Sequence, residues 1–406
     1  EVTSAKSKRA KIQKHLGQTI GKENVCFDPF TLIGHATDAT DWRLCLPLAV
    51  VYPAEESQVA PLLDAIHSLK LCAIPRGGGT GLTGGSVPVR NNCIVINTEK
   101  LNNIEGIKQV QYQRDNNNLT VPVLKVRAGV ITQDAMAAAA SEGFVFATDP
   151  TSAWASTIGG NISENAGGKT AVLWGTAIDN IFSYSIIVPK FGLCQVARVN
   201  HPLRKIQPDE TVSFDVTSID GGYTRRIDLS GLEIRKKGLW KDITNKALGG
   251  LPGLQKEGTD GIITSAEFIL HRAYAKKLTF CIEFFGDDMD EASCVIVEIS
   301  KEFADKGEEA LMALEHFDEE YIKAINYKFK AARSERPKAV LLIDMVGHTD
   351  EQIQRGRQRF IELLAPYVNT ELFIAKDSDE AARFWRDRKR LGAIERPAQP
   401  RRVRVR

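Results

Sequence analysis

The chain has 406 residues, of which 43% are hydrophobic and 26% are charged, and its formal net charge is only +2. This length can bury a large core and suggests two domains or more, while the near balance of charge argues against a nucleic-acid partner. No apolar run is long enough to span a membrane, because the longest, around 44–51, is interrupted by Pro47.

Seven cysteines are scattered along the chain, with no Cys-x-x-Cys pair and an odd total. This pattern gives neither a disulfide framework nor a structural zinc or iron–sulfur site, and it fits a reducing compartment. We therefore predict a cytoplasmic protein and leave open a peripheral membrane role through a partner.

The first half of the chain predicts strands and helices around a glycine-rich loop. Spacing of apolar residues predicts a helix over 4–20, then a strand at 46–51, a helix at 55–69 and a strand at 71–74. The loop 75–86, Pro-Arg-Gly-Gly-Gly-Thr-Gly-Leu-Thr-Gly-Gly-Ser, follows that strand directly. Its scarcity of Cβ atoms lets backbone N–H groups gather around an anion such as a phosphate.

Two familiar phosphate motifs do not fit their context. Residues 79–84 satisfy G-x-G-x-x-G, and Glu99 stands where a Rossmann fold places its acidic residue, but the β-like run 87–97 cannot supply the helix which that site requires. Gly168-Lys169-Thr170 resembles the end of a P-loop, yet the required first glycine is Ser163.

The chain then continues with two more clusters of small residues. We predict a strand at 119–126, a helix at 131–142, a strand at 181–188, an irregular polar stretch at 202–242 and strands up to residue 270. From about residue 275 strands and helices alternate regularly, which predicts a separate domain. Thr349 with Gln352 and Asp377 with Glu380 have capping-box spacing at two predicted helix starts.

Three motifs in this order resemble the FAD-binding domain of the vanillyl-alcohol oxidase (p-cresol methylhydroxylase) superfamily. They are Pro-Arg-Gly-Gly-Gly-Thr-Gly at 75–81, Ile-Gly-Gly-Asn-x-x-x-Asn-Ala-Gly-Gly at 158–168 and Glu-Gly-Thr-x-Gly-Ile-Ile-Thr at 257–264. The similarity is greatest to the D-lactate dehydrogenase, glycolate oxidase D-subunit and D-2-hydroxyglutarate dehydrogenase branch. It implies an α+β fold, with a two-subdomain FAD-binding domain followed by a ferredoxin-like α/β cap domain.

The expected boundaries are an N-terminal helix at 1–25, the FAD-binding domain at 26–274, with subdomains at about 26–115 and 116–274, a partial cap domain at 275–395 and an irregular tail at 396–406. The family continues beyond this point with a histidine-rich segment that supplies active-site histidines and metal ligands, and no such segment occurs in the sequence. We therefore expect that the sequence is the first part of a longer enzyme, and we assign no metal ligand.

The resemblance also implies which residues contact FAD. The loop 76–86 would hold the pyrophosphate, and the segment 157–168 would lie near the ribityl chain and the isoalloxazine. Thr80 stands where relatives with covalent flavin often carry histidine, so FAD is expected to bind non-covalently; Lys256 and Asp260 replace the family's usual Ser and Leu. The expected FAD-binding residues are Pro75, Arg76, Gly77, Gly78, Gly79, Thr80, Gly81, Gly84, Gly85, Ser86, Pro150, Thr157, Gly159, Gly160, Asn161, Asn165, Gly167, Gly261 and Ile263.

The activity that the resemblance implies is oxidation of a D-2-hydroxy acid of the lactate, glycolate or 2-hydroxyglutarate type, by hydride transfer to the flavin. Arg388, in Trp385-Arg-Asp-Arg388, matches a family element that holds the substrate carboxylate, although a surface role in a basic run is equally open. The electron acceptor would be a quinone, a cytochrome, a flavoprotein or an iron–sulfur protein. Two alternatives remain: an FAD-binding protein or fragment without its own turnover, and a different FAD-dependent reaction, such as NADPH-dependent enolpyruvate reduction or sugar-lactone oxidation.

Overall fold

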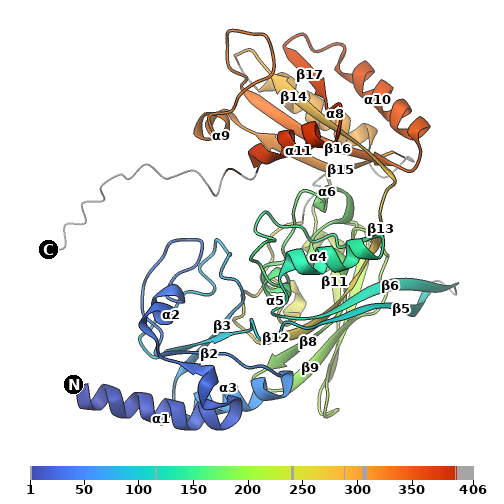
Figure 1. Ribbon diagram of the computed structural model, residues 1–406. Coiled ribbons are helices and arrows are strands. Elements are labelled where there is room, and N and C mark those ends of the chain that lie inside the picture. Colours follow the sequence, from blue (N-terminus) through green and yellow to red (C-terminus); the bar gives the residue numbers. More distant parts are fainter. Residues whose placement is uncertain are drawn as a thin grey trace. The chain divides into compact units, whose positions relative to one another are not determined.

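The computed structural model describes residues 2–114, 117–238, 242–287, 289–303, 309–388 and 390. Leu391 and the predicted tail 396–406 lie outside the described residues. The chain divides into a first unit, Glu1–Ala273, and a second unit, Tyr274–Arg406, drawn in Figure 1.

A small sheet of four strands begins the first unit. Its order is β1-β2-β4-β3, in which β2, β4 and β3 run parallel and β1 runs antiparallel to β2. Helix α3 (Val59–Ser68) connects β2 to β3, and α1 (Val2–Ile20) packs beside α3 as Figure 1 shows. Buried apolar side chains of α1, α3 and the sheet form one core. The strands are β1 (Val25–Cys26), β2 (Ala49–Val51), β3 (Cys72–Arg76) and β4 (Cys93–Asn97).

The predicted strand, helix and strand before the glycine loop are confirmed. The loop connects β3 to β4 without any helix, so the structure also confirms that the G-x-G-x-x-G spacing is not a Rossmann site.

An antiparallel sheet of seven strands forms the larger part of the first unit, in the order β11-β10-β9-β8-β12-β6-β5. Helices α4 (Thr132–Ser141) and α5 (Ile158–Glu164) contact it, and their apolar residues join its main core. The strands are β5 (Ile104–Arg114), β6 (Asn117–Arg127), β8 (Ile181–Val188), β9 (Gly192–Arg198), β10 (Thr211–Ser218), β11 (Thr224–Ser230) and β12 (Ile262–Ile269).

The prediction of an irregular stretch over 202–242 is wrong, because β10 and β11 form a hairpin there. In β10 the side chains at 212, 214, 216 and 218 are buried and alternate with less buried polar ones, the pattern of a strand with one face on the core. Gly221 adopts a φ of +75° in the turn. The alternation and the Asp-Gly-Gly turn were the signals in the sequence.

Short elements complete the first unit. Strands β7 and β13 pair with each other, antiparallel, and several short helices lie in the connections. The elements are α2 (Pro29–Gly34), β7 (Phe144–Val145), α6 (Ala171–Trp174), α7 (Ala177–Asn180), β13 (His271–Arg272) and the 3-10 turns Lys22–Asn24, Glu56–Gln58, Gly231–Glu233 and Leu248–Gly250.

The second unit is a four-stranded antiparallel sheet in the order β15-β16-β14-β17. In chain order this arrangement is 2-3-1-4, the order of a ferredoxin-like sheet, which confirms the predicted fold. The elements are β14 (Lys276–Phe284), α8 (Asp290–Glu302), β15 (Ala310–Phe317), α9 (Glu319–Ala324), β16 (Ala339–Gly347), α10 (Asp350–Leu364), β17 (Thr370–Ile374) and α11 (Ser378–Arg386).

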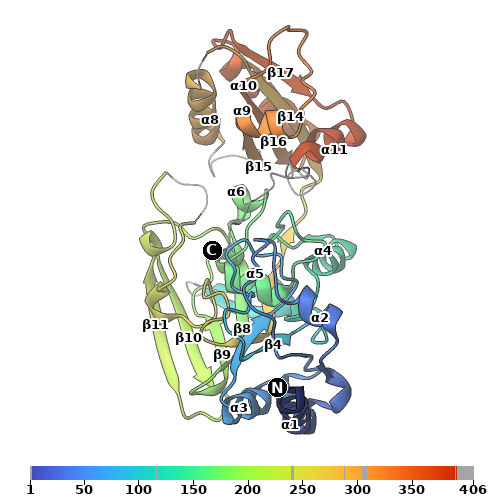
Figure 2. The same cartoon turned by 90° about the vertical axis from the view of Figure 1, so that its left-hand side faces the viewer.

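Alternation along β14 divides the helices of this unit between the two faces of the sheet. Cys281 packs in one core with residues of α9 and α11, while the ring of Phe280 stacks on Phe360 of α10 at 4.4 Å between centroids. Figure 2 shows α8 and α10 on the other side of the sheet from α9 and α11. The predicted caps are present: the side chain of Thr349 accepts from the N–H of Gln352, and that of Asp377 from the N–H of Glu380.

Candidate cofactor site

Three segments of the first unit meet around one cavity of about 330 Å³. They are the glycine loop after β3, the segment 150–166 that contains α5, and the turn 257–261 before β12. The N–H of Glu257 donates to the carbonyl of Ser163 at 3.0 Å, which ties the third segment to the second. Residues far apart in the sequence, from Asp38 to Ile263, therefore line one surface.

The glycine loop approaches the second segment so closely that side chains are excluded. A Cβ on Gly77 would lie 2.1 Å from Oγ1 of Thr157, and a Cβ on Gly78 would lie 2.0 Å from the carbonyl oxygen of Ala155. Gly79 has a φ of +64°, which an L side chain rarely adopts. These positions require glycine because of backbone contact as well as conformation.

The loop leaves its amide groups available to a ligand. Within the described residues, no backbone N–H of residues 77–86 donates a hydrogen bond to another protein group. Amide groups that line a cavity without protein partners suit an anion with several oxygen acceptors. A diphosphate has this chemistry.

Arg76, the last residue of β3, places a positive charge beside the loop. Its Nη1 donates to the carbonyl of Thr37 at 2.6 Å and to Oγ of Ser86 at 3.4 Å, so the side chain links the end of the loop to the segment that contains Thr37. Burial lowers the pKa of Arg76 from its ordinary value, and the nearby carboxylate of Asp38 opposes this shift. The guanidinium therefore adds to the attraction for an anion.

Carboxylates of Asp38, Glu164 and Glu257 also line the cavity. Burial raises the pKa of Glu164, and the negative charge of Glu257 raises it further. Burial acts in the same direction on Glu257, but hydrogen bonds from Lys246 and Thr83 and the charge of Lys246 outweigh it, so its pKa is lowered. The cavity thus contains one carboxyl whose pKa is raised and one whose pKa is lowered.

Helix α5 is held by a cap at its N-terminus and by a hydrogen bond to α4. Thr157 is its N-cap, and its side chain accepts from the N–H of Gly160 at 3.3 Å. The Nδ2 of buried Asn161 donates to Oγ1 of Thr132 at 2.9 Å, which connects α5 to α4. The close turns of the second motif are therefore held by hydrogen bonds within the core.

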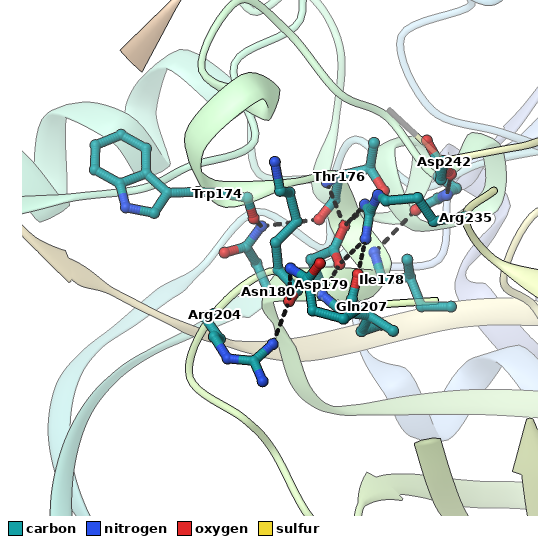
Figure 3. Close-up of polar contacts among 12 residues, drawn as sticks. Trp174, Thr176, Ile178, Asp179, Asn180, Arg204, Gln207, Arg235 and Asp242 are labelled. Atoms are coloured by element: carbon teal, nitrogen blue, oxygen red, sulfur yellow. Dashed lines mark hydrogen bonds and ion pairs between the residues drawn. The ribbon is translucent and has the colours of Figure 1, made fainter. Parts of the chain in front are cut away.

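A buried polar network supports the chain that follows α5, as Figure 3 shows. Asp179 accepts from the N–H of Thr176 at 2.8 Å and pairs with Arg235 at 2.9 Å; both charged side chains are almost completely buried. Asn180 donates to the carbonyl oxygens of Trp174 and Thr176. This network fixes the segment 174–180, which includes the end of α6 and the whole of α7.

Sixteen of the nineteen residues that the sequence assigns to FAD line the cavity. The other three, Gly84, Asn165 and Gly167, are not part of its lining. Asn165 adopts the left-handed conformation at the end of α5, where its Oδ1 accepts from the N–H of Ile178 at 2.8 Å and its Nδ2 donates to Asp242. The structure gives this residue a supporting role in the network.

Several lining residues were missed because they lie outside the recognised motifs. They are Asp38, Thr98, Ser152 and Ser156. Asp38 is 9% exposed, and its Oδ2 has no hydrogen-bond partner within the described residues. Ser152 and Ser156 lie just before the second motif, whereas Asp38 and Thr98 come from other parts of the chain and reach the cavity only through the fold of the first unit.

Arg388, the candidate for the substrate carboxylate, lies just beyond α11 in the second unit. Its Nη2 forms an ion pair with Oε1 of Glu315 at 2.8 Å, and both side chains are largely buried. Phe384 and Trp385 are buried, and the indole N–H of Trp385 donates to Asp344 at 2.7 Å. Arg388 is thus largely buried, and it already has a carboxylate partner.

The histidines stand apart from one another in the described residues. There, no three or more His, Cys, Asp or Glu side chains are arranged to hold a metal ion. The ring of His271 stacks on Trp174, its Nε2 contacts Oδ1 of Asn180 at 2.7 Å, and burial lowers its pKa to about 4. No helix of the described residues is long and apolar enough to cross a bilayer.

Two family models match the chain in succession. Residues 47–191 match the FAD binding domain, and residues 287–402 match the C-terminal domain of FAD linked oxidases. The first match covers the glycine loop and the second motif, and the second covers most of the ferredoxin-like unit.

Relatives with similar sequences include the glycolate oxidase subunit GlcD of Bacillus subtilis, 30% identical over 44% of this chain and 35% of the relative. The GlcD subunit of Escherichia coli K12 is 24% identical over 84% of this chain and 57% of the relative. The mitochondrial D-2-hydroxyglutarate dehydrogenase of Arabidopsis thaliana is 24% identical over 91% of this chain and 57% of the relative. The chain spans between about a third and three fifths of the length of these relatives.

Solved structures share the fold at lower sequence identity. Alkyldihydroxyacetonephosphate synthase superimposes with a TM-score of 0.64 at 17% identity, covering 94% of this chain and 65% of that one. A p-cresol methylhydroxylase with bound substrate superimposes with a TM-score of 0.62 at 13% identity, covering 92% and 68%. These similarities concern the architecture of the chain.

Proposed function

We propose, because the chain belongs to the FAD-linked oxidoreductases of the p-cresol methylhydroxylase type, that it oxidises a D-2-hydroxy acid and delivers the electrons to a carrier other than a nicotinamide. The observation that carries the proposal is the cavity of the first unit. There a glycine loop with available amide groups, Arg76 and the second motif converge. The names of the relatives, a glycolate oxidase subunit and a D-2-hydroxyglutarate dehydrogenase, support the class of substrate.

The residues around the cavity fit an FAD diphosphate. The amide groups of residues 77–86 offer donors without protein partners, and the contacts at Gly77 and Gly78 leave no room for side chains between the loop and α5. Ser86, Thr157 and Asn161 add polar side chains to the lining. Thr80 is not a residue that forms a bond to flavin, so we propose non-covalent binding.

When bound, FAD supplies the hydride-accepting chemistry; the protein supplies placement and charge. In the second unit Arg388 is our candidate for holding the substrate carboxylate, since a guanidinium can donate two parallel hydrogen bonds to it. Its ion pair with Glu315 would have to be exchanged or extended when substrate binds. Buried aromatic residues beside it would keep the guanidinium in a fixed orientation.

Anaerobic bleaching of the flavin absorbance tests the proposal. The chain loaded with FAD is mixed with D-lactate, glycolate or D-2-hydroxyglutarate; L-lactate and L-2-hydroxyglutarate are the controls for the two chiral substrates, and glycolate is achiral. Rapid bleaching by a D-2-hydroxy acid and not by its enantiomer is the expected result. FAD binding without bleaching by any of the three would contradict the activity for this chain, and bleaching by NADPH alone would favour a different FAD-dependent reaction.

Non-covalent attachment has a separate test. Acid precipitation of the loaded protein should release the whole of the flavin into the supernatant, measured by its absorbance. Flavin that stays with the precipitate would contradict this part of the proposal.

A further inference from the structure

Glu164, the last residue of α5, lines the cavity directly beside the glycine loop. Its Oε1 lies 3.0 Å from the position that a Cβ on Gly81 would occupy, and it accepts a hydrogen bond from Oγ1 of Thr83 at 3.4 Å. The carboxylate therefore contacts the loop that we assign to the diphosphate. We infer that Glu164 takes up a proton when FAD binds, and that its charge sets the affinity of the cavity for the cofactor; this inference rests on the proposed FAD site.

The charged groups that face Glu164 do not neutralise it. Glu257 lies across the loop, where a Cβ on Gly85 would be 3.0 Å from the Cβ of Glu257, and Asp38 acts on Glu164 as a second negative charge. Lys246 is the facing cation, but its ammonium group pairs with Glu257. An ionised Glu164 would thus be a further negative charge in a cavity that has to accept a dianion.

Burial and Glu257 already raise the pKa of Glu164 in the free protein, while Lys246 and the hydrogen bond from Thr83 oppose the rise. A diphosphate in the same cavity adds negative charge and raises that pKa further. Protonation removes the repulsion and creates an O–H group that can donate to a phosphate oxygen.

The direction of the pH dependence follows because the pKa of Glu164 is higher in the FAD complex than in the free protein. Below the pKa of the free protein, Glu164 is neutral in both states, and the affinity for FAD is at its highest. As the pH rises from there to the pKa of the complex, the dissociation constant increases by up to about tenfold per pH unit, and above the second value it is constant.

The experiment measures FAD binding to the full chain between about pH 5 and pH 8, by quenching of flavin fluorescence and by calorimetry in buffers of different ionisation enthalpy. The wild-type protein should bind more weakly as the pH rises and should take up protons on binding. Glu164→Gln should bind with a dissociation constant that is independent of pH and close to the low-pH value of the wild type, without the proton uptake.

Two further variants separate Glu164 from other groups. Asp242 has a pKa of about 6, raised by burial and then by Asp179, so it titrates within the pH range of the experiment without lining the cavity. Asp242→Asn should keep the pH dependence of FAD binding. Glu142 is exposed at the end of α4, and Glu142→Gln is the matched control, with wild-type behaviour expected.

The outcomes are distinct. Equal pH dependence in wild type and Glu164→Gln, loss of the dependence in Asp242→Asn, or FAD binding by the wild type without proton uptake would each overturn the inference alone. The proton-uptake measurement needs no variant, so it decides even if Glu164→Gln does not fold. Absence of FAD binding by the wild type at every pH would overturn the inference together with the proposed function.

Discussion

The guanidinium of Arg235 and the carboxylate of Asp179 form an ion pair that is closed off from solvent: Nη2 and Oδ2 are 2.9 Å apart, and the side chains are 2% and 0% exposed. Asp179 also accepts from the backbone N–H groups of Thr176 and Ile206, each at 2.8 Å. The pair therefore joins Arg235, which follows β11, to the segment after the second motif (Figure 3).

Replacement of Arg235 by methionine should destabilise the first unit strongly. It leaves Asp179 as a buried carboxylate without its cation, which costs about 3–5 kcal/mol in the free energy of unfolding. Urea unfolding measures the change. The matched control is Arg226→Met, which breaks a solvent-exposed pair with Asp215 and should change the free energy of unfolding far less. Similar losses in both variants would contradict the role that we assign to burial.

Alanine at Gly78 should weaken FAD binding. Its Cβ would lie 2.0 Å from the carbonyl oxygen of Ala155, so either the glycine loop or the segment 150–166 must move. The amide groups of the loop would then no longer point together into the cavity. We expect a loss of affinity of about tenfold or more, measured by fluorescence titration. Gly34→Ala is the control, because nothing lies within 4 Å of the added Cβ. Unchanged binding by Gly78→Ala would show that the loop does not hold the cofactor.

The buried carboxyl of Asp242 should make stability depend on pH. Its pKa in the folded state is about 6, above the ordinary value of 3.8, because of burial and the charge of Asp179. The folded state therefore holds this proton more tightly than the unfolded state, and the contribution to stability is complete below about pH 4 and is lost as the pH rises through about 6.

Asp242→Asn should remove that pH-dependent loss. The difference of about two pKa units corresponds to roughly 3 kcal/mol. The free energy of unfolding of the variant, measured relative to that of the wild type, should therefore be higher at pH 8 than at pH 4 by up to this amount. Thermal unfolding across the pH range measures it. Asp64→Asn, on the exposed side of α3, should follow the wild type at every pH. Parallel curves for Asp242→Asn and wild type would contradict the assignment.

Replacement of Arg388 by methionine separates substrate binding from structure. If the guanidinium holds the substrate carboxylate, flavin reduction should require a substrate concentration about 10–100-fold higher, whereas FAD affinity should not change. Stopped-flow absorbance measures the reduction, and thermal unfolding reports the cost of losing the ion pair with Glu315. Arg383→Met, at an exposed position of α11, should behave as wild type. A variant that is only less stable would leave Arg388 with a structural role.

Local chemistry in the sequence was sufficient for much of the architecture. The alternation of strands and helices in the second unit and the caps at Thr349 and Asp377 depend on neighbours a few residues apart, so short patterns predict them. The same reading failed at β10 and β11, where polar residues on the exposed face obscured a period-two pattern.

The glycine clusters determined by themselves that backbone must approach backbone, and their order along the chain determined the family. Only the tertiary structure decided which groups share the cavity. Asp38, Glu164 and Glu257 meet there, Asn165 turns into the polar network, and Arg388 pairs with Glu315. The reason is physical. A glycine cluster indicates close packing or an unusual backbone conformation at its own position. The charges that face a ligand depend on strand pairings between residues far apart in the sequence, which no local pattern encodes.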